Sequence, residues 1–421
     1  MLSQPLRIAV WYNLPSGGAK RALYNHLAGL KARGHQIESF RPPVDDIQFM
    51  PLADVVDRET EFPWPHWQQH SWFYPKEIKL STDEVNRYTA SAHYHAKLAA
   101  EQINSGNFDI LFANTCMQFH APHIGRYVQI PKLLYLQEPN RPLYEPLPRL
   151  LWIAEEPSAS RGVVKFKAKA RHWINTRSVG IRGREELLNA KSFDQILVNS
   201  FFSREAVLRA YGLNSKVCYL GINPGMFKNL ELQRENFVMG IGTLGPSKNV
   251  LLVIEALGKV PKELRPSLVW VANMTDPPYR DACVARSAEL DVSFTHRSMI
   301  PDEELVSLLN RAMMMVYAPR LEPFGFAPLE ANLCGLPVIA VAEGGVRETV
   351  VDGLNGLLVD HEPTIFADAI VRLIKDEPLR LRLGRQGYER ALNQWGLDQA
   401  DDNLEAELHK TYLDKTKTGA R

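Results

Sequence analysis

Hydrophobic positions along the chain fall into short runs that alternate with longer segments of helical period. The runs are apolar and rich in β-branched residues, as in strands that are buried on both faces of a parallel sheet. Apolar residues in the intervening segments lie three and four positions apart, as in amphipathic helices. This alternation predicts an α/β fold with doubly wound parallel sheets. We expect strands at residues 6–12, 110–113, 133–136, 195–199, 237–241, 268–272, 292–295, 314–318 and 337–341.

The alternation is interrupted once, by a polar stretch at residues 223–236. We therefore expect two Rossmann-like domains in tandem, an N-terminal domain at 1–222 and a C-terminal domain at 223–394. Ligands of such sheets bind beyond the carboxyl ends of the strands, so two facing sheets would place the site in a crevice between them. Helices are predicted after Gly17-Gly18, ending near Gly34, and at 249–257, 279–290, 303–311, 364–375 and 379–394.

Two segments, 44–94 and 142–189, do not follow the alternation and look like insertions whose roles the sequence does not indicate. Within the second, residues 161–184 contain eight Lys or Arg and no Asp or Glu, with aromatic and aliphatic residues among them. This pattern is typical of a basic amphipathic element that lies on an anionic membrane or receives an anionic acceptor. A solvated helix face is an equally good interpretation.

Composition limits the function classes. Lys and Arg number 49 and Asp and Glu 48, a net charge of +1, which argues against a general nucleic-acid binder. The hydrophobic fraction of 45% excludes a disordered chain. The four cysteines are widely spaced, which favours a reducing compartment. No apolar run is long enough for a membrane span, and the amino terminus lacks a signal-peptide layout. We expect a cytoplasmic protein, with any membrane contact at its surface.

A glycine-rich loop, G-x-G-x-x-G at residues 240–245, lies between a predicted strand and a predicted helix. Its backbone N–H groups could approach a phosphate, and the helix dipole would add to the attraction. A nicotinamide site should have an acidic residue after the next strand, where this chain has Asn273. Lys248 supplies a cation instead, so a phosphate-binding loop is favoured over a dinucleotide oxidoreductase, with a simple tight turn as the third interpretation. Gly17-Gly18 repeats the arrangement more weakly in the first domain.

Two carboxylates stand out at residues 318–337. Glu322 follows a predicted strand, and Glu330 is expected in the first turn of a short helix. Pro328 suits that first turn and Gly335 suits the helix end. Two acceptors beside free amides would suit a polyhydroxyl ligand joined to a phosphate, although Glu330 could simply pair with the helix dipole. The amides in question are those of Phe324, Gly325 and Phe326.

This stretch resembles the E-x7-E signature of the retaining glycosyltransferases of the GT-B fold, family 4 or "group 1". The resemblance covers most of the chain and is strongest from about residue 195 to 360. It is carried by the acidic pair together with segments 198–200, 220–223, 242–249, 344–350 and 352–359.

The resemblance implies a nucleotide-sugar donor of UDP or GDP type, held mainly by the second domain. Glu322 would contact the sugar hydroxyls, Glu330 the ribose, and Lys248 the diphosphate, together with the amides of Gly325 and Phe326. It also implies that the last helix, at 395–421, packs back on the first domain. The further candidates are Gly242, Thr243 and Phe324 for the donor, Arg297 near the expected base, Gly17 and Gly18 closing over the donor, and Gln137 and Glu138 on the acceptor side.

The reaction that follows from the resemblance is transfer of a hexose with retention of configuration to a glycan, lipid-linked or small-molecule acceptor. We expect no metal or cofactor, because the chain has no D-x-D motif and its histidines show no ligand set. Two positions depart from the family pattern: Thr243 stands where Arg is usual, and Gln137 where many members have His. These departures motivate the alternative of a nucleotide-sugar-binding protein that has lost transfer.

Overall fold

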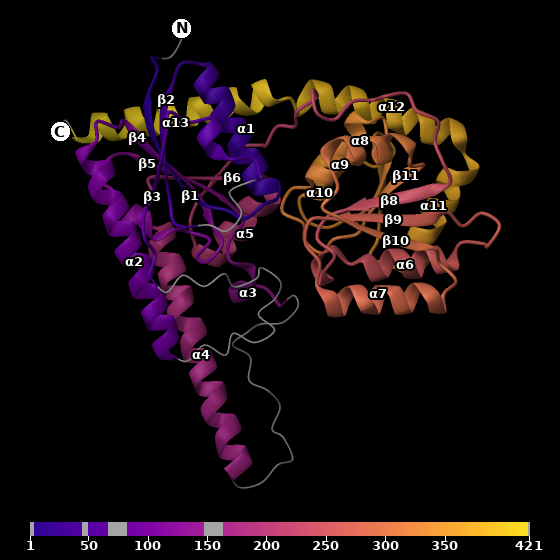
Figure 1. The fold of residues 1–421 in the computed structure, drawn as a ribbon, viewed down its shortest axis with the longest axis horizontal. Coiled ribbons are helices and arrows are strands. Elements are labelled where there is room, and N and C mark those ends of the chain that lie inside the picture. Colours follow the sequence, from indigo (N-terminus) through magenta and orange to yellow (C-terminus); the bar gives the residue numbers. More distant parts are fainter. Residues whose placement is uncertain (1–3, 44–48, 66–81, 147–162, 420–421) are drawn as a thin grey trace. The chain divides into compact units, whose positions relative to one another are not determined.

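The structure is a computed structural model of the 421-residue chain, described for residues 4–43, 49–65, 82–146 and 163–419. The chain divides into two compact units (Figure 1). Unit 1 comprises Met1–Cys218 with Asp401–Arg421, and unit 2 comprises Tyr219–Ala400. Each unit contains a parallel sheet with helices between its strands. The predicted fold class, α/β with two doubly wound sheets, is confirmed.

The sheet of unit 1 has the strand order β3-β2-β1-β4-β5-β6-β7, and neighbouring strands pair in parallel. The chain leaves β1 in one direction and returns to place β4 on the other side of β1. The topological switch point therefore lies between β1 and β4. The strands are β1 (Arg7–Asn13), β2 (Gln36–Arg41), β3 (Arg58–Glu61), β4 (Ile110–Cys116), β5 (Lys132–Gln137), β6 (Gln195–Val198) and β7 (Lys216–Val217).

Helices of unit 1 cover both faces of this sheet at its centre. Its central strand β4 is buried at every position, as a strand covered on both faces must be. Trp11, Phe40 and Phe119 are among the large side chains of the core. The helices are α1 (Gly18–Ala32), η1 (Leu52–Asp54), α2 (Thr82–Ser105), η2 (His123–Arg126), α3 (Arg141–Tyr144), α4 (Val163–Ala190), α5 (Phe201–Tyr211) and, from Asp401 onward, α13 (Leu397–Gly419).

The sheet of unit 2 has the order β10-β9-β8-β11-β12-β13, also parallel throughout its pairs. Here the switch point lies between β8 and β11. A second core, separate from that of unit 1, includes Trp270, Val253 and Phe366. The strands are β8 (Phe237–Ile241), β9 (Ser267–Ala272), β10 (Phe294–Ser298), β11 (Met314–Tyr317), β12 (Val338–Val341) and β13 (Gly356–Val359).

Several helices of the chain begin at side-chain caps. Glu362 accepts a hydrogen bond from the Ile365 N–H at the start of α11, and Asp376 accepts one from the Leu379 N–H at the start of α12, each at 2.9 Å. Such caps satisfy amides that have no partner within the helix. The helices of unit 2 are η3 (Pro246–Lys248), α6 (Val250–Lys259), α7 (Pro277–Glu289), α8 (Asp302–Arg311), α9 (Phe326–Leu333), α10 (Val346–Thr349), α11 (Pro363–Lys375) and α12 (Glu377–Gln394).

The structure contains four strands that the hydrophobic pattern did not predict: β2, β3, β7 and β13. Strand β3 has the sequence RETE and lies at the sheet edge, where only one side is paired and charged side chains can face water. The segment 44–94, interpreted as an insertion, thus supplies an edge strand and the start of α2.

The basic segment 161–184 is mostly helical. Residues 161 and 162 lie outside the described residues, and α4 begins at Val163. In Figure 1 its amino-terminal part extends beyond the sheet of unit 1. Among the side chains described, Trp173 is 63% exposed and lies beside the Arg177 guanidinium, 5.7 Å from it, while Arg182 donates to the Gln118 carbonyl.

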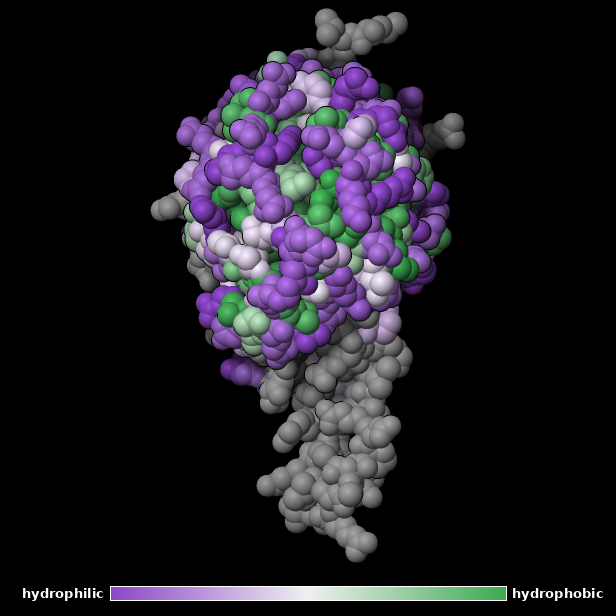
Figure 2. Space-filling view, turned by 90° about the vertical axis from the view of Figure 1, so that its right-hand side faces the viewer, coloured by the Kyte–Doolittle hydropathy of each residue, from purple (hydrophilic) through white to green (hydrophobic). Residues whose placement is uncertain are grey.

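Figure 2 shows one side of the molecule, on which hydrophilic side chains predominate and hydrophobic ones lie among them. Within the described residues, none of the helices is both apolar enough and long enough to span a bilayer.

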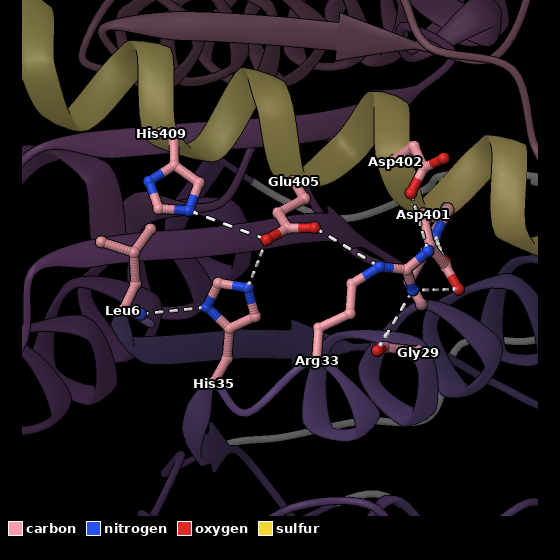
Figure 3. A network of polar contacts seen from close by, with 9 residues as sticks. Leu6, Gly29, Arg33, His35, Asp401, Asp402, Glu405 and His409 are labelled. Carbon is pink, nitrogen blue, oxygen red and sulfur yellow. Dashed lines mark hydrogen bonds and ion pairs between the residues drawn. The ribbon is translucent and has the colours of Figure 1, made fainter. Parts of the chain in front are cut away.

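Helix α13 is attached to unit 1 by a charged network (Figure 3). Asp401 accepts hydrogen bonds from Arg33 at 3.3 Å and lies 2.9 Å from Nδ1 of His26. Arg33 also donates to Asp402 at 2.9 Å. A Cβ at Gly29 would lie 1.8 Å from Asp401 Oδ2, so the absence of a side chain there lets α1 approach α13 closely. The carboxyl-terminal helix is therefore part of the folded core of unit 1.

We expect Asp401→Asn to lower the free energy of unfolding by about 3 kcal/mol, because the side chain of Asp401 is 4% exposed and its loss of charge leaves buried donors uncompensated. Asp402→Asn is the matched control: it removes a charge from the same Arg33, but its side chain is 65% exposed, so the cost should stay below about 1 kcal/mol. Urea unfolding of the full chain measures both values. Equal effects of the two substitutions would contradict the assigned role of burial.

Candidate functional site

The loops that follow β8 and β11 lie side by side at the switch point of unit 2. Strand β8 leads into the glycine-rich loop and β11 into the loop that carries Glu322. A backbone hydrogen bond of 3.0 Å from the Arg320 N–H to the Ser247 carbonyl joins the two loops directly. The topology alone thus brings together two motifs that are separated by more than seventy residues in the sequence.

The glycine-rich loop is held on the sheet by Trp270. Its indole Nε1 donates to the Gly242 carbonyl at 2.8 Å, and the Gly242 N–H donates to the Val271 carbonyl at 3.0 Å. A Cβ at Gly240 would lie 2.1 Å from the Trp270 ring, whereas Gly242 has a positive φ of 136°. The first glycine is therefore required by packing and the second by backbone conformation. The loop continues through η3 and Asn249 before α6 begins at Val250.

Lys248 and Glu322 form an ion pair across the two loops. Lys248 Nζ lies 2.5 Å from Glu322 Oε2, and the two side chains are 20% and 17% exposed. The Lys248 stem passes over Gly242, since a Cβ at Gly242 would lie 3.2 Å from Lys248 Cε. The candidates predicted to hold the phosphate and the sugar are thus in direct contact in this state.

Tyr317, the last residue of β11, lies beneath this pair and was not singled out from the sequence. Its side chain is buried, its hydroxyl lies close to the Glu322 carboxylate, and its ring lies 5.9 Å from Lys248 Nζ. Burial raises the pKa of Tyr317 well above its usual range, and the nearby Glu322 and Glu330 carboxylates raise it further. The hydroxyl therefore remains a donor at physiological pH.

The backbone around Glu322 is unusual. Leu321 has a positive φ of 48°, a conformation that costs a residue with a Cβ on the order of 1–2 kcal/mol. The Glu322 carbonyl accepts from the Gly345 N–H at 2.7 Å, which fixes the loop against the turn before α10. Gln137 at the end of β5, Asn249 after Lys248 and Met299 after β10 also have positive φ, and each is a predicted site residue or lies within two residues of one. Such strain is concentrated at functional sites.

Helix α9 begins at Phe326, after Gly325 in a left-handed conformation with φ of 101°. The prediction that Glu330 lies in the first turn is wrong, because Glu330 is the fifth residue of α9. The helix starts before Pro328 because proline is tolerated anywhere in a first turn, where amides have no intrahelical acceptor. Glu330 is buried, and α9 begins four residues after Glu322.

Arg297 is the donor-side candidate that the structure does not bring to this pair. It lies on β10, the edge strand, and β9 separates β10 from β8. Its guanidinium forms an ion pair with Glu304 on α8. Thr243 lies in the glycine-rich loop, where its carbonyl accepts from the Gly245 N–H at 3.0 Å.

The candidates of unit 1 lie at the carboxyl ends of its strands. Gly17 precedes α1, has a positive φ of 144°, and accepts from the Arg21 N–H at 3.0 Å. Gly18 is the first residue of α1. Gln137 ends β5 in the left-handed region, with φ of 64°, and accepts from Asn199 Nδ2 at 3.0 Å. Glu138 lies 3.4 Å from the Arg141 guanidinium. The roles of these residues stay predictions.

Two groups of side chains in the described residues have the composition of a metal site, and in each a histidine Nδ1 already accepts a hydrogen bond. His35 Nδ1 accepts from the Leu6 N–H at 3.0 Å, so its proton is on Nε2, which faces Glu405 at 3.2 Å (Figure 3). A nitrogen that carries a proton cannot ligate a metal.

The second group comprises His93, His123 and Glu185. His123 Nδ1 accepts from the Asn189 amide at 3.2 Å, which leaves the proton on Nε2, facing Glu185 at 3.6 Å. Burial lowers the pKa of His123 to about 4, and Arg126 already pairs with Glu185 at 2.8 Å. This group is therefore a charged hydrogen-bond network in unit 1.

Two parallel α/β sheets with helices between their strands define the GT-B class of glycosyltransferase folds, and solved structures share it. Sucrose-phosphate synthase from Thermosynechococcus elongatus matches with a TM-score of 0.71 at 18% identity, over 97% of this chain and 100% of that one. Anabaena HepE in complex with UDP and glucose matches with a TM-score of 0.65 at 18% identity, over 96% and 100%.

The family model described as "Glycosyl transferases group 1" matches residues 223–390. This segment of unit 2 is therefore similar to the group 1 glycosyltransferases, as the motif resemblance implied. The match favours a glycosyltransferase over the oxidoreductase interpretation of the glycine-rich loop.

Curated relatives are similar over part of their length. The D-inositol 3-phosphate glycosyltransferase of Corynebacterium diphtheriae is 42% identical over 94 residues, which are 22% of each chain. The alpha-1,3/1,6-mannosyltransferase of Dictyostelium discoideum is 27% identical over 255 residues, 58% of each chain. The chain thus spans less than two thirds of the relatives that it matches.

Proposed function

We propose that this protein is a retaining glycosyltransferase that moves a hexose from a nucleoside-diphosphate sugar to a hydroxyl of its acceptor. The observation that carries the proposal is the Lys248–Glu322 pair at the switch point of unit 2, where a cation for a diphosphate and a carboxylate for sugar hydroxyls meet. The names of the relatives agree with it, since they transfer mannose or act on D-inositol 3-phosphate. HepE, a structural neighbour, binds UDP-glucose.

In this proposal the donor separates the pair. Lys248 turns to the diphosphate, the amides at the start of α9 donate to the same phosphates, and Glu322 accepts hydrogen bonds from the sugar hydroxyls. Glu330, buried on α9, binds the ribose. The glycine-rich loop provides close backbone approach.

The chemical step breaks the bond between the anomeric carbon and the diphosphate oxygen and forms a bond from that carbon to the acceptor oxygen on the same face. The acceptor proton passes to the departing phosphate oxygen, so no protein base is needed. Lys248 and the oriented amides stabilise the charge that builds on the diphosphate. These groups take the place of a divalent cation, and we propose that no metal is required.

We propose that the acceptor is a glycan or a lipid-linked molecule that binds on the side of unit 1. Gln137, which ends β5, and Glu138, which follows it, are the residues proposed to contact the acceptor, and the left-handed backbone of Gln137 supports this proposal. The exposed Trp173 beside Arg177 on α4 suits contact with an anionic surface.

A panel of nucleoside diphosphates in a thermal-shift assay tests the donor class. The matching nucleotide should stabilise the full chain by about 2.7 kcal/mol at a concentration one hundred times its dissociation constant. With the corresponding nucleotide sugar, NMR of the product should show the donor's anomeric configuration, and EDTA should leave the rate unchanged. Nucleotide binding with donor hydrolysis at only the buffer rate would favour a protein that has lost transfer. Inversion of configuration would overturn the proposed reaction.

A further inference from the structure

Tyr317 is a buried side chain that lies beside both members of the Lys248–Glu322 pair. Its hydroxyl lies close to the Glu322 carboxylate, and its ring faces the Lys248 ammonium at 5.9 Å. As the last residue of β11, it is fixed by the central part of the sheet and is buried to 2% exposure. The two members of the pair come from the segments that follow β8 and β11: Lys248 ends η3, and Glu322 lies between β11 and α9.

The nucleotide sugar must break the Lys248–Glu322 ion pair before it can bind both side chains. Lys248 Nζ lies 2.5 Å from Glu322 Oε2, and its charge makes that oxygen a weaker acceptor for a sugar hydroxyl. A neutral hydroxyl beside the carboxylate can orient it without adding a counter-charge, and a ring beside the ammonium gives the cation a favourable contact outside the pair. Tyr317 supplies both interactions from a fixed position.

We infer that Tyr317 is a positioning residue of the donor site, which holds Glu322 toward the sugar while Lys248 is released to the diphosphate. This inference rests on the proposed function. It adds a residue whose two parts should affect the sugar and the nucleotide separately. The hydroxyl acts through Glu322 and therefore on the sugar, whereas the ring acts through Lys248 and therefore on the diphosphate.

Tyr317→Phe keeps the ring and removes the hydroxyl. We expect kcat for transfer to fall about tenfold, the loss of one hydrogen bond to a charged group. The affinity for the nucleoside diphosphate alone, which lacks the sugar, should remain within about twofold. Tyr317→Leu removes the ring as well, so it should weaken nucleoside diphosphate binding in addition. Its folding is checked by the unfolding temperature without ligand.

Tyr279→Phe is the matched control. The Tyr279 hydroxyl accepts from the Leu251 N–H at 3.2 Å in the same unit, so its removal costs a comparable hydrogen bond but should leave kcat unchanged. If wild type transfers sugar and Tyr317→Phe does so at the same rate, the inference is wrong while the proposed function stands. If wild type neither binds nucleotides nor turns over any nucleotide sugar, the proposed function fails first. An equal loss of nucleotide affinity and kcat in Tyr317→Phe would indicate a merely structural role.

Discussion

Replacing Glu322 by alanine is expected to lower sugar transfer by roughly 10²- to 10³-fold while leaving nucleoside diphosphate binding intact or stronger. The carboxylate is the predicted partner of the sugar hydroxyls, so its loss removes an interaction that the nucleotide alone never makes. It also removes the counter-ion that lies 2.5 Å from Lys248 Nζ, which frees the ammonium for the diphosphate. Steady-state rates and nucleotide titration of the same protein measure the two effects.

Lys248→Ala should behave differently. The cation is the proposed partner of the diphosphate in both ground and transition states, so nucleotide affinity and transfer should both fall. A transfer loss of about 10²-fold or more is expected, in line with removal of one group that stabilises developing charge. The two variants should therefore differ in nucleotide affinity, which falls in Lys248→Ala but not in Glu322→Ala. Full transfer activity in either variant would contradict the role assigned to that residue.

The Glu235–Arg311 pair offers a control for these substitutions. It joins a carboxylate and a guanidinium at 2.6 Å in the same unit, but both side chains are more than 40% exposed and the pair lies away from the two loops. Exposed pairs contribute little to stability. Glu235→Ala and Arg311→Ala should leave transfer and nucleotide binding as in wild type, so that any loss in the Lys248 or Glu322 variants is specific to the site.

The hydrophobic pattern predicted the parts of the fold in which local sequence and burial agree. Strand β11, with the sequence MMVY, is apolar and buried at every position, as expected of a strand that is covered on both faces. Strand β3, with the sequence RETE, forms only because β2 offers an unpaired edge, which no local pattern records. The same distinction applies to the glycines: Gly242 could be recognised from its motif, but the packing of Gly240 on Trp270 is a tertiary contact.

The sequence indicated the charged residues of the candidate site, but it did not indicate the residue that positions them. Glu322 and Lys248 are recognisable because a carboxylate after a strand and a cation in a glycine-rich loop are chemically unusual. Tyr317 ends an apolar strand, so its sequence position is that of a core residue. Only the structure shows that its hydroxyl lies close to Glu322. The helical position of Glu330 was misjudged because Pro328 marks a first turn without marking its first residue.

Gly344→Ala is expected to reduce both stability and transfer, because Gly344 supports the loop that carries Glu322. A Cβ at Gly344 would lie 2.4 Å from the Glu322 carbonyl oxygen and 2.7 Å from its nitrogen, and these are backbone atoms that cannot rotate away. The position also has a positive φ of 63°, which costs alanine about 1–2 kcal/mol. Relief of the clash requires the Glu322 backbone to move, at a further cost of roughly 1–3 kcal/mol.

Gly353→Ala separates these two costs. Gly353 has a similar φ of 72° in the same unit, but a Cβ there meets nothing within 4 Å. This control should lose only the conformational cost and retain transfer. Gly344→Ala should lose more stability in urea unfolding and, at temperatures where it is folded, transfer sugar at least about tenfold more slowly, since a displacement near 1 Å of a reacting group commonly costs 10²-fold. Equal stability and equal transfer in the two variants would mean that the position of Glu322 does not depend on its contact with Gly344, and that the carboxylate is held by Tyr317 and Lys248 alone.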